Sequence, residues 1–137
     1  MIGIINYGLG NLSSVNNAFK KVSDDVEIFD DPNLIKKYSK LVLPGVGSFK
    51  AGMKLLIEKE WNDRIENFVK SGNYLLGICL GMQLLFKNGF EDGQTDGLNL
   101  IEGSVTEMKI DKKLKLPHVG WNSLIFKKEH QFFNNIN

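Results

Sequence analysis

The chain has 137 residues, of which 42% are hydrophobic and 24% charged, a length and composition that suit one globular domain with its own core. Seventeen basic residues nearly balance sixteen acidic ones, which gives no electrostatic reason to expect a nucleic acid or an anionic membrane as a partner. No apolar run approaches the roughly 20 residues that span a bilayer, and the single cysteine excludes an internal disulfide and favours the cytoplasm.

Apolar runs and helical spacing alternate along the first half of the chain. Short apolar runs predict strands over 2–5, 26–29 and 41–43. Apolar residues at helical spacing predict a helix over 12–22 and an amphipathic helix over 61–70, which Ser71 and Gly72 end. Strands and helices therefore alternate along this part of the sequence.

The next elements surround the only cysteine. Residues 74–78 are apolar without alternation, which predicts a fourth strand buried on both faces, and helical spacing resumes over 80–86. Because strands that alternate with helices pair in parallel through right-handed crossovers, the sequence predicts an α/β fold with a doubly wound, mostly parallel sheet flanked by helices. Further strands are expected over 98–101, 104–108 and 124–126.

Cys79 stands between the predicted fourth strand and the helical run, with Gly77 and Gly81 two residues away on either side. This spacing is typical of a nucleophile elbow, a sharp strand-to-helix turn that strains its central residue and needs small neighbours. Backbone N–H groups at the start of a helix favour the thiolate. A lone cysteine is otherwise usually a small core residue, but the glycines and the switch from strand to helix favour a nucleophile here.

Four further segments accompany the elbow: residues 6–12 (NYGLGNL), 43–49 (LPGVGSF), 97–103 (GLNLIEG) and 117–122 (PHVGWN). Together with 77–86 (GICLGMQLLF), they resemble the class I, triad-type glutamine amidotransferases, in the form found in the glutaminases of imidazole glycerol phosphate synthase. The resemblance extends over the whole chain and implies a three-layer, flavodoxin-like domain over 1–137, with no cofactor and no metal.

The resemblance implies a reaction in which a thiolate attacks the side-chain amide of glutamine. A thioester forms as ammonia leaves, and water then frees glutamate. Cys79 would be the nucleophile, and the backbone N–H groups of Leu80 and of Val46 or Gly47 would stabilise the oxyanion by about 3 kcal/mol each. An ordinary Pro-Gly turn is the alternative interpretation of the segment around Gly45.

Gly45, Gln83 and Glu91 are the residues that the resemblance assigns to binding the substrate glutamine. Gln83 would lie one helical turn beyond Cys79 on the same face. The residues before Glu91 are less acidic than the family's stretch, so a solvated loop glutamate is the alternative there.

The resemblance also implies a partner. Pro117, His118, Trp121 and Asn122 would lie at the interface with a (β/α)8-barrel cyclase, along the route of ammonia, although an ordinary core or interface aromatic is compatible with Trp121. We expect the intact protein to form a heterodimer that makes imidazole glycerol phosphate during histidine synthesis. A glutaminase that supplies ammonia to a sugar-modifying partner is the alternative.

The family's catalytic histidine and glutamate, in a Phe-His-Pro-Glu-like motif near its C-terminus, have no match in the 137 residues. His130 lacks the His-x-Glu spacing and is expected at the surface. The sequence therefore predicts a C-terminally incomplete domain, an N-terminal portion of an active glutaminase. The alternatives are a short form that binds or regulates a cyclase-like partner without hydrolysis, and a small flavodoxin-like domain with coincidental motifs. A His-Pro-Glu segment encoded beyond Asn137 would identify the chain as a fragment. A stop codon at that point would support the short form.

For the 137-residue chain alone we expect negligible glutaminase activity, even with the partner present. Without a base, a thiol near its ordinary pKa of about 8.5 is only a few per cent ionised at neutral pH. The measurement is glutamate and ammonia release from glutamine. Robust release would mean that His118 or His130 serves as the base.

Overall fold

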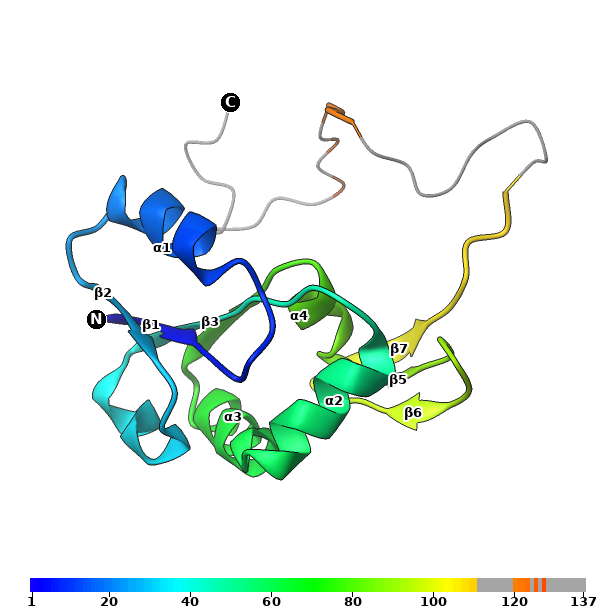
Figure 1. The fold of residues 1–137 in the computed structure, drawn as a ribbon, viewed down its shortest axis with the longest axis horizontal. Coiled ribbons are helices and arrows are strands. Elements are labelled where there is room, and N and C mark those ends of the chain that lie inside the picture. Colours follow the sequence, from blue (N-terminus) through cyan, green and yellow to red (C-terminus); the bar gives the residue numbers. More distant parts are fainter. Residues whose placement is uncertain (111–119, 124, 126, 128–137) are drawn as a thin grey trace. The chain divides into compact units, whose positions relative to one another are not determined.

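The computed structural model describes residues 1–110, 120–123, 125 and 127 (Figure 1). The chain divides into two compact units, Met1–Glu107 and Met108–Asn137. In the second unit the described residues form neither helix nor strand. Leu124 and Phe126, in the strand expected over 124–126, lie outside the described residues. The first unit contains all the elements that follow.

The first unit is built on a four-stranded parallel sheet (Figure 1). Its strands are β1 (Ile2–Ile5), β2 (Val26–Phe29), β3 (Lys40–Leu43) and β4 (Tyr74–Gly77), in the order β2-β1-β3-β4. All neighbours pair in parallel, which confirms the predicted α/β fold. Because the strand order reverses between β1 and β3, the loops after these two strands diverge at the carboxyl edge, where ligands bind in such sheets.

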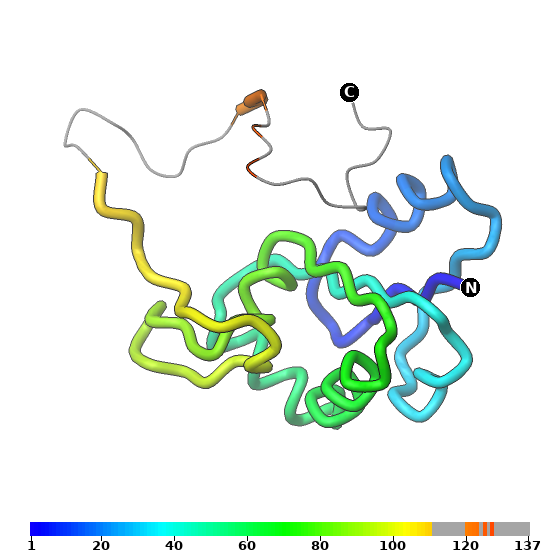
Figure 2. The backbone as a smooth tube through the Cα atoms, turned by 180° about the vertical axis from the view of Figure 1, so that it is seen from behind, coloured from blue at the N-terminus to red at the C-terminus, as the bar shows by residue number. Residues whose placement is uncertain are grey.

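Helices flank this sheet on both faces, with α1 (Leu12–Lys20) on one side and α3 (Trp61–Lys70) on the other (Figures 1 and 2). A 3₁₀ helix, η1 (Pro32–Lys37), precedes β3. The helix α2 (Phe49–Glu58) was not predicted from the sequence. It begins at Ser48, whose side chain accepts a hydrogen bond from the Ala51 N–H. Among the described residues no helix has the length and apolar character needed to cross a bilayer.

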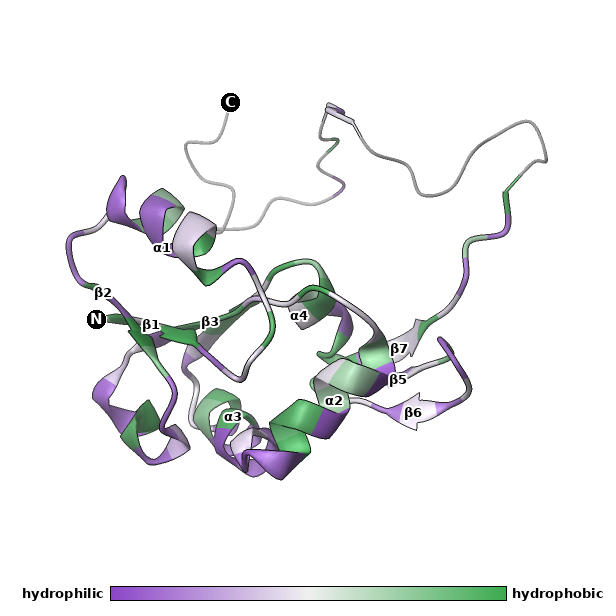
Figure 3. Cartoon of the chain, in the orientation of Figure 1, coloured by the Kyte–Doolittle hydropathy of each residue, from purple (hydrophilic) through white to green (hydrophobic). Residues whose placement is uncertain are grey.

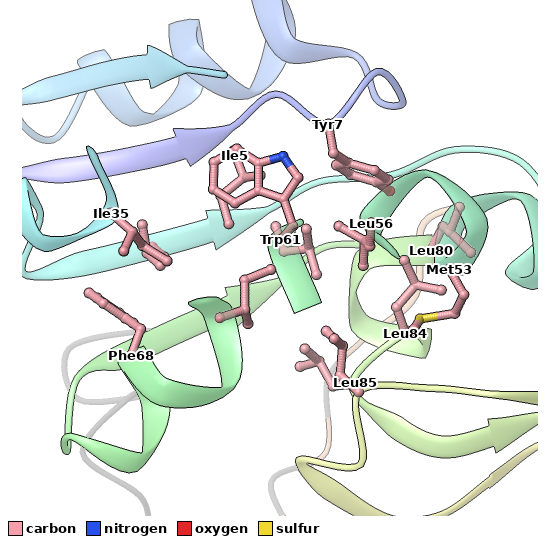
Figure 4. Packing of buried hydrophobic residues seen from close by; sticks show 14 of the residues in the cluster. Ile5, Tyr7, Ile35, Met53, Leu56, Trp61, Phe68, Leu80, Leu84 and Leu85 are labelled. Atoms are coloured by element: carbon pink, nitrogen blue, oxygen red, sulfur yellow. The ribbon is translucent and has the colours of Figure 1, made fainter. Parts of the chain in front are cut away.

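The main core lies on the side of the sheet that α2 and α3 cover, since no residue of α1 is buried. Trp61 is fully buried there and meets Phe29 edge to face, with ring centroids 5.2 Å apart. Figure 3 shows β1 as hydrophobic, whereas α3 carries both hydrophobic and hydrophilic residues. Figure 4 shows the side chains that converge in this core, among them Ile5, Tyr7, Ile35, Met53, Leu56, Phe68, Leu80, Leu84 and Leu85.

The strand β4 differs from its prediction. The sequence indicated burial on both faces, but Tyr74 is 61% exposed and Leu75 and Leu76 are only half-buried. The reason is its place in the sheet, because β4 pairs with β3 alone and is the edge strand among the described residues.

The helix predicted over 80–86 is also shorter than expected. The helix α4 spans only Leu80–Gln83, and the strand β5 (Phe86–Gly89) follows. The carbonyls of Leu84 and Leu85 accept hydrogen bonds from the backbone of residues 98–101 instead of extending the helix. These contacts start a second sheet.

The second sheet has three strands, in the order β6-β5-β7. The strand β6 (Thr95–Asp96) pairs antiparallel and β7 (Ile101–Val105) parallel to β5. The sequence predicted two strands over 98–101 and 104–108, and the structure forms the single strand β7, which overlaps both ranges.

Candidate active site

Cys79 forms a strained turn between β4 and α4. Its backbone has φ 54° and ψ −117°, a left-handed conformation that costs a residue with a side chain about 1–3 kcal/mol. The Gln83 N–H donates to the Cys79 carbonyl at 3.1 Å, so the helical turn begins directly after the strained residue. The thiol is exposed, which argues against the alternative of a small core cysteine.

The two glycines beside this turn are required by close backbone approach. A Cβ atom on Gly77 would lie 2.5 Å from the Met82 Cα, and one on Gly81 would lie 1.8 Å from the Leu43 carbonyl oxygen. Both contacts are with main-chain atoms, which cannot rotate away. The turn therefore packs on its own helix and on the end of β3, and this is the physical reason for glycine at both positions.

The loop after β3 lies against this turn. A Cβ atom on Gly45 would lie 2.9 Å from the Gly81 nitrogen and 3.0 Å from the Leu80 Cβ. The Ile78 N–H also donates to the Leu43 carbonyl at 3.0 Å, which ties the end of β4 to the start of the loop. The structure thus brings Gly45 and the Cys79 turn together, although they are more than 30 residues apart in the sequence.

Backbone N–H groups are available at the start of α4 and in the loop after β3. Leu80 is the first residue of α4, a position whose N–H has no acceptor within its own helix. Gly47 has φ 111° and open space around its Cα, and Val46 is 52% exposed. This combination suits a loop that presents an N–H group to a ligand.

The two remaining substrate-binding candidates differ in their surroundings. Gln83 is the last residue of α4 and is partly buried. Glu91 is exposed, and its Oε2 accepts a hydrogen bond of 2.9 Å from the Phe49 N–H at the start of α2. A carboxylate in this position stabilises the helix through the unpaired N–H groups of its first turn. Glu91 therefore has a structural contact that neither the sequence pattern nor the solvated-loop alternative indicated.

Tyr7 is a site neighbour to which the sequence assigned no role. It lies in the loop after β1 and is fully buried. Its hydroxyl lies 2.6 Å from the position that a Cβ atom on Gly45 would occupy. One indication of a role for Tyr7 was present in the sequence, its place in the segment 6–12. The burial of its side chain was not predictable, because it depends on the loop after β3, which is distant in the sequence.

Burial and, second, the negative charge of Cys79 raise the pKa of Tyr7 from 10.0 to about 12. The folded chain therefore keeps a proton that the unfolded chain releases above its ordinary pKa. The protonated Tyr7 hydroxyl therefore contributes to the free energy of unfolding. This contribution is fully present below about pH 10 and is lost as pH rises through the folded-state pKa, which lowers the free energy of unfolding by about 2 kcal/mol. We expect wild type to lose more of its free energy of unfolding between pH 9 and pH 11 than Tyr7→Phe does, measured by urea denaturation. Equal losses would contradict this assignment.

The strain at Cys79 predicts a difference between two variants that both remove the thiol. Cys79→Gly relieves the left-handed conformation, whereas Cys79→Ala keeps it. After allowance for the greater freedom of glycine in the unfolded chain, Cys79→Gly should be more stable than Cys79→Ala by about 1 kcal/mol. Urea denaturation of the two variants measures the difference, and a glycine variant no more stable than the alanine variant would show that the turn is unstrained.

The residues expected at a partner interface are only partly described. Pro117 and His118 lie outside the described residues, as does His130. Trp121 is fully exposed, and Asn122 is also exposed, both in the second unit. Their proposed contact with a partner therefore stays a prediction.

Comparison with known proteins agrees with these observations. Residues 4–137 match the sequence model of the family described as "Glutamine amidotransferase class-I". The imidazole glycerol phosphate synthase subunit HisH of Caldanaerobacter subterraneus subsp. tengcongensis is 47% identical over 136 residues, which cover 99% of this chain and 66% of that protein. The subunit of the same name from Sulfurimonas denitrificans is 46% identical, with 99% of this chain and 67% of that protein covered. The chain thus spans about two thirds of the length of these relatives.

A solved structure gives the same fold. A glutamine amidotransferase crystal structure superposes with a TM-score of 0.66 at 22% sequence identity, over 77% of this chain and 55% of that chain. At this identity the likeness concerns the fold, and it agrees with a parallel sheet flanked by helices.

Proposed function

Because the chain belongs to the class-I glutamine amidotransferase family, we propose that it carries the nucleophile of a glutaminase, within one domain that includes residues 1–137. The observation that carries the proposal is the turn at Cys79, where an exposed thiol sits on a left-handed backbone at the end of a parallel strand. Such a turn is energetically costly and presents the side chain outward, as a nucleophile elbow requires. A cysteine with a purely structural role does not require such a strained turn.

In the proposed reaction the Cys79 sulfur attacks the side-chain carbonyl carbon of glutamine. The carbon–nitrogen bond of the resulting tetrahedral intermediate breaks, and the nitrogen takes up a proton and leaves as ammonia. Water then attacks the thioester carbon, which frees glutamate and returns the thiol. Both steps need a group that moves protons, and the chain's two histidines, His118 and His130, lie outside the described residues.

The negative oxygen of the tetrahedral intermediate needs hydrogen-bond donors that are already in place. We assign this role to the N–H of Leu80 and to an N–H of the loop at Val46 or Gly47. Support comes from the position of Leu80 at the start of α4 and from the packing of Gly45 against that start. Each such donor lowers the barrier by about 3 kcal/mol.

The substrate glutamine is proposed to lie between Gly45, Gln83 and Glu91. Gln83 is joined through its N–H to the Cys79 carbonyl, and Glu91 caps α2, which begins two residues after Gly47. The Glu91 carboxylate can accept a hydrogen bond from the substrate's amino group while it keeps its hydrogen bond from the Phe49 N–H.

The acceptor of ammonia is proposed to be a (β/α)8-barrel cyclase subunit, in a heterodimer that acts in histidine synthesis in the cytoplasm. Two relatives that are 46–47% identical are named as subunits of imidazole glycerol phosphate synthase. This shared name favours the histidine pathway over a sugar-modifying partner. Pro117, His118, Trp121 and Asn122 are the residues proposed to face the cyclase.

The experiment is glutamate release from glutamine by the complete protein, measured with and without the cyclase subunit. We expect release that depends on Cys79, with ammonia incorporated into the cyclase product when the partner is present. Release of glutamate without incorporation into that product would contradict the proposed partner. No release under either condition would contradict the glutaminase.

A further inference from the structure

The hydroxyl of Tyr7 is a buried polar group that the proposed reaction does not use. Tyr7 is 0% exposed, and within the part of the chain that the structure describes its Oη has no hydrogen-bond partner. A buried hydroxyl without a partner is costly, and such a group in a native protein calls for a function or a ligand. The side chain comes from the loop after β1 and points toward the region of Leu80 (Figure 4).

The position of this hydroxyl connects it with the Cys79 turn. The two converge beside Gly45, because the point where a Cβ on Gly45 would stand lies 2.6 Å from the Tyr7 Oη, 2.9 Å from the Gly81 nitrogen and 3.0 Å from the Leu80 Cβ. The negative charge of Cys79 also contributes, after burial, to the raised pKa of Tyr7. Both observations place the donor close to the start of α4, where the thiol is carried.

Two charged groups contact neighbouring parts of the loops after β1 and β3. The Lys59 Nζ lies 3.3 Å from the point where a Cβ on Gly8 would stand, and the Glu91 carboxylate caps α2. Neither group forms a hydrogen bond with the Tyr7 Oη.

We propose that the Tyr7 hydroxyl is the hydrogen-bond donor that stabilises the Cys79 thiolate and orients its sulfur. The exposed thiol has a single side-chain torsion, so its sulfur can adopt the rotamer that faces the donor. A phenol that stays protonated at neutral and mildly alkaline pH remains a hydrogen-bond donor over that pH range. The inference rests on the proposed role of Cys79 as nucleophile and adds a residue to that site.

The test uses the rate of alkylation of the 137-residue chain by iodoacetamide as a function of pH. Cys79 is the only cysteine, so the signal belongs to one thiol, and the thiolate is the reacting form. In Tyr7→Phe we expect the midpoint of the profile to move up by about one pH unit, which lowers the rate at neutral pH roughly tenfold. A purely structural role of the ring leaves the midpoint where it is.

Tyr38→Phe is the matched control. Tyr38 is 3% exposed, and burial and the Glu27 carboxylate raise its pKa to about 12 as well. It packs on Phe29, with ring centroids 4.2 Å apart, and the charge of Cys79 has no part in its raised pKa. An unchanged midpoint in Tyr7→Phe, or equal shifts in both variants, would overturn the proposal.

A second measurement does not depend on the folding of Tyr7→Phe. The ¹³Cζ resonance of Tyr7 in the otherwise unchanged chain should show an inflection at the pH where the thiol ionises, and Cys79→Ser should remove it. A resonance with no such inflection would overturn the proposal. Neither measurement needs glutamine hydrolysis, so the role of Tyr7 and the glutaminase function are tested separately. A protein that does not hydrolyse glutamine but still shows the Tyr7 effect would refute the glutaminase function alone.

Discussion

Replacement of Cys79 by alanine is expected to lower the glutaminase turnover of the complete protein by at least about 10⁴-fold, as loss of a nucleophile does in other covalent hydrolases. The reason is that thioester formation has no substitute once the sulfur is gone. Alanine keeps the left-handed backbone of residue 79 and so leaves the turn, Leu80 and Gln83 in place. Glutamate release under saturating glutamine is the measurement.

The matched control is Ser23→Ala, which removes a side-chain oxygen from a half-buried residue between α1 and β2, remote in sequence from the site. Its turnover should equal that of wild type. If Cys79→Ala keeps turnover within tenfold of wild type, another group performs the attack and the proposed reaction is wrong.

Replacement of Gly81 by alanine is expected to destabilise the chain by about 3 kcal/mol or more, since overpacking against a fixed backbone is among the most costly single changes. The new Cβ would lie 1.8 Å from the Leu43 carbonyl oxygen. That atom belongs to the end of β3, so the clash is relieved only if α4 moves away from the sheet. The free energy of unfolding, from urea denaturation, measures the effect.

Gly93→Ala separates this clash from the general effect of adding a methyl group to a glycine. Gly93 has φ 95° and no atom within 4 Å of its would-be Cβ, so the variant loses only the backbone preference, about 1 kcal/mol. We expect Gly81→Ala to unfold at clearly lower urea than Gly93→Ala. Equal midpoints would mean that α4 does not pack on β3 as the structure has it.

Much of the parallel sheet follows from local sequence patterns. The strand at Ile2–Ile5 and the helix that begins at Trp61 are defined by their own apolar spacing, and the structure forms them within a residue or two of the predicted bounds. The turn at Cys79 was also recognisable, because its glycines and its strand-to-helix position are local features.

Features that depend on distant residues were not predictable in this way. The helix after Cys79 stops at Gln83 because residues 98–101 take the carbonyls that would extend it. The contact of Glu91 with the Phe49 N–H spans 42 residues. The partial exposure of β4 follows from strand order, which a run of apolar residues does not reveal. In each case a tertiary contact overrides the local preference.

Covalent labelling with a glutamine analogue that carries an electrophilic diazoketone tests whether the Cys79 thiol is a nucleophile directed at glutamine. We expect one adduct per chain, located at Cys79 by peptide mass spectrometry, that forms more slowly when glutamine is in excess. Labelling at other residues, or labelling at Cys79 that glutamine leaves unchanged, would contradict it.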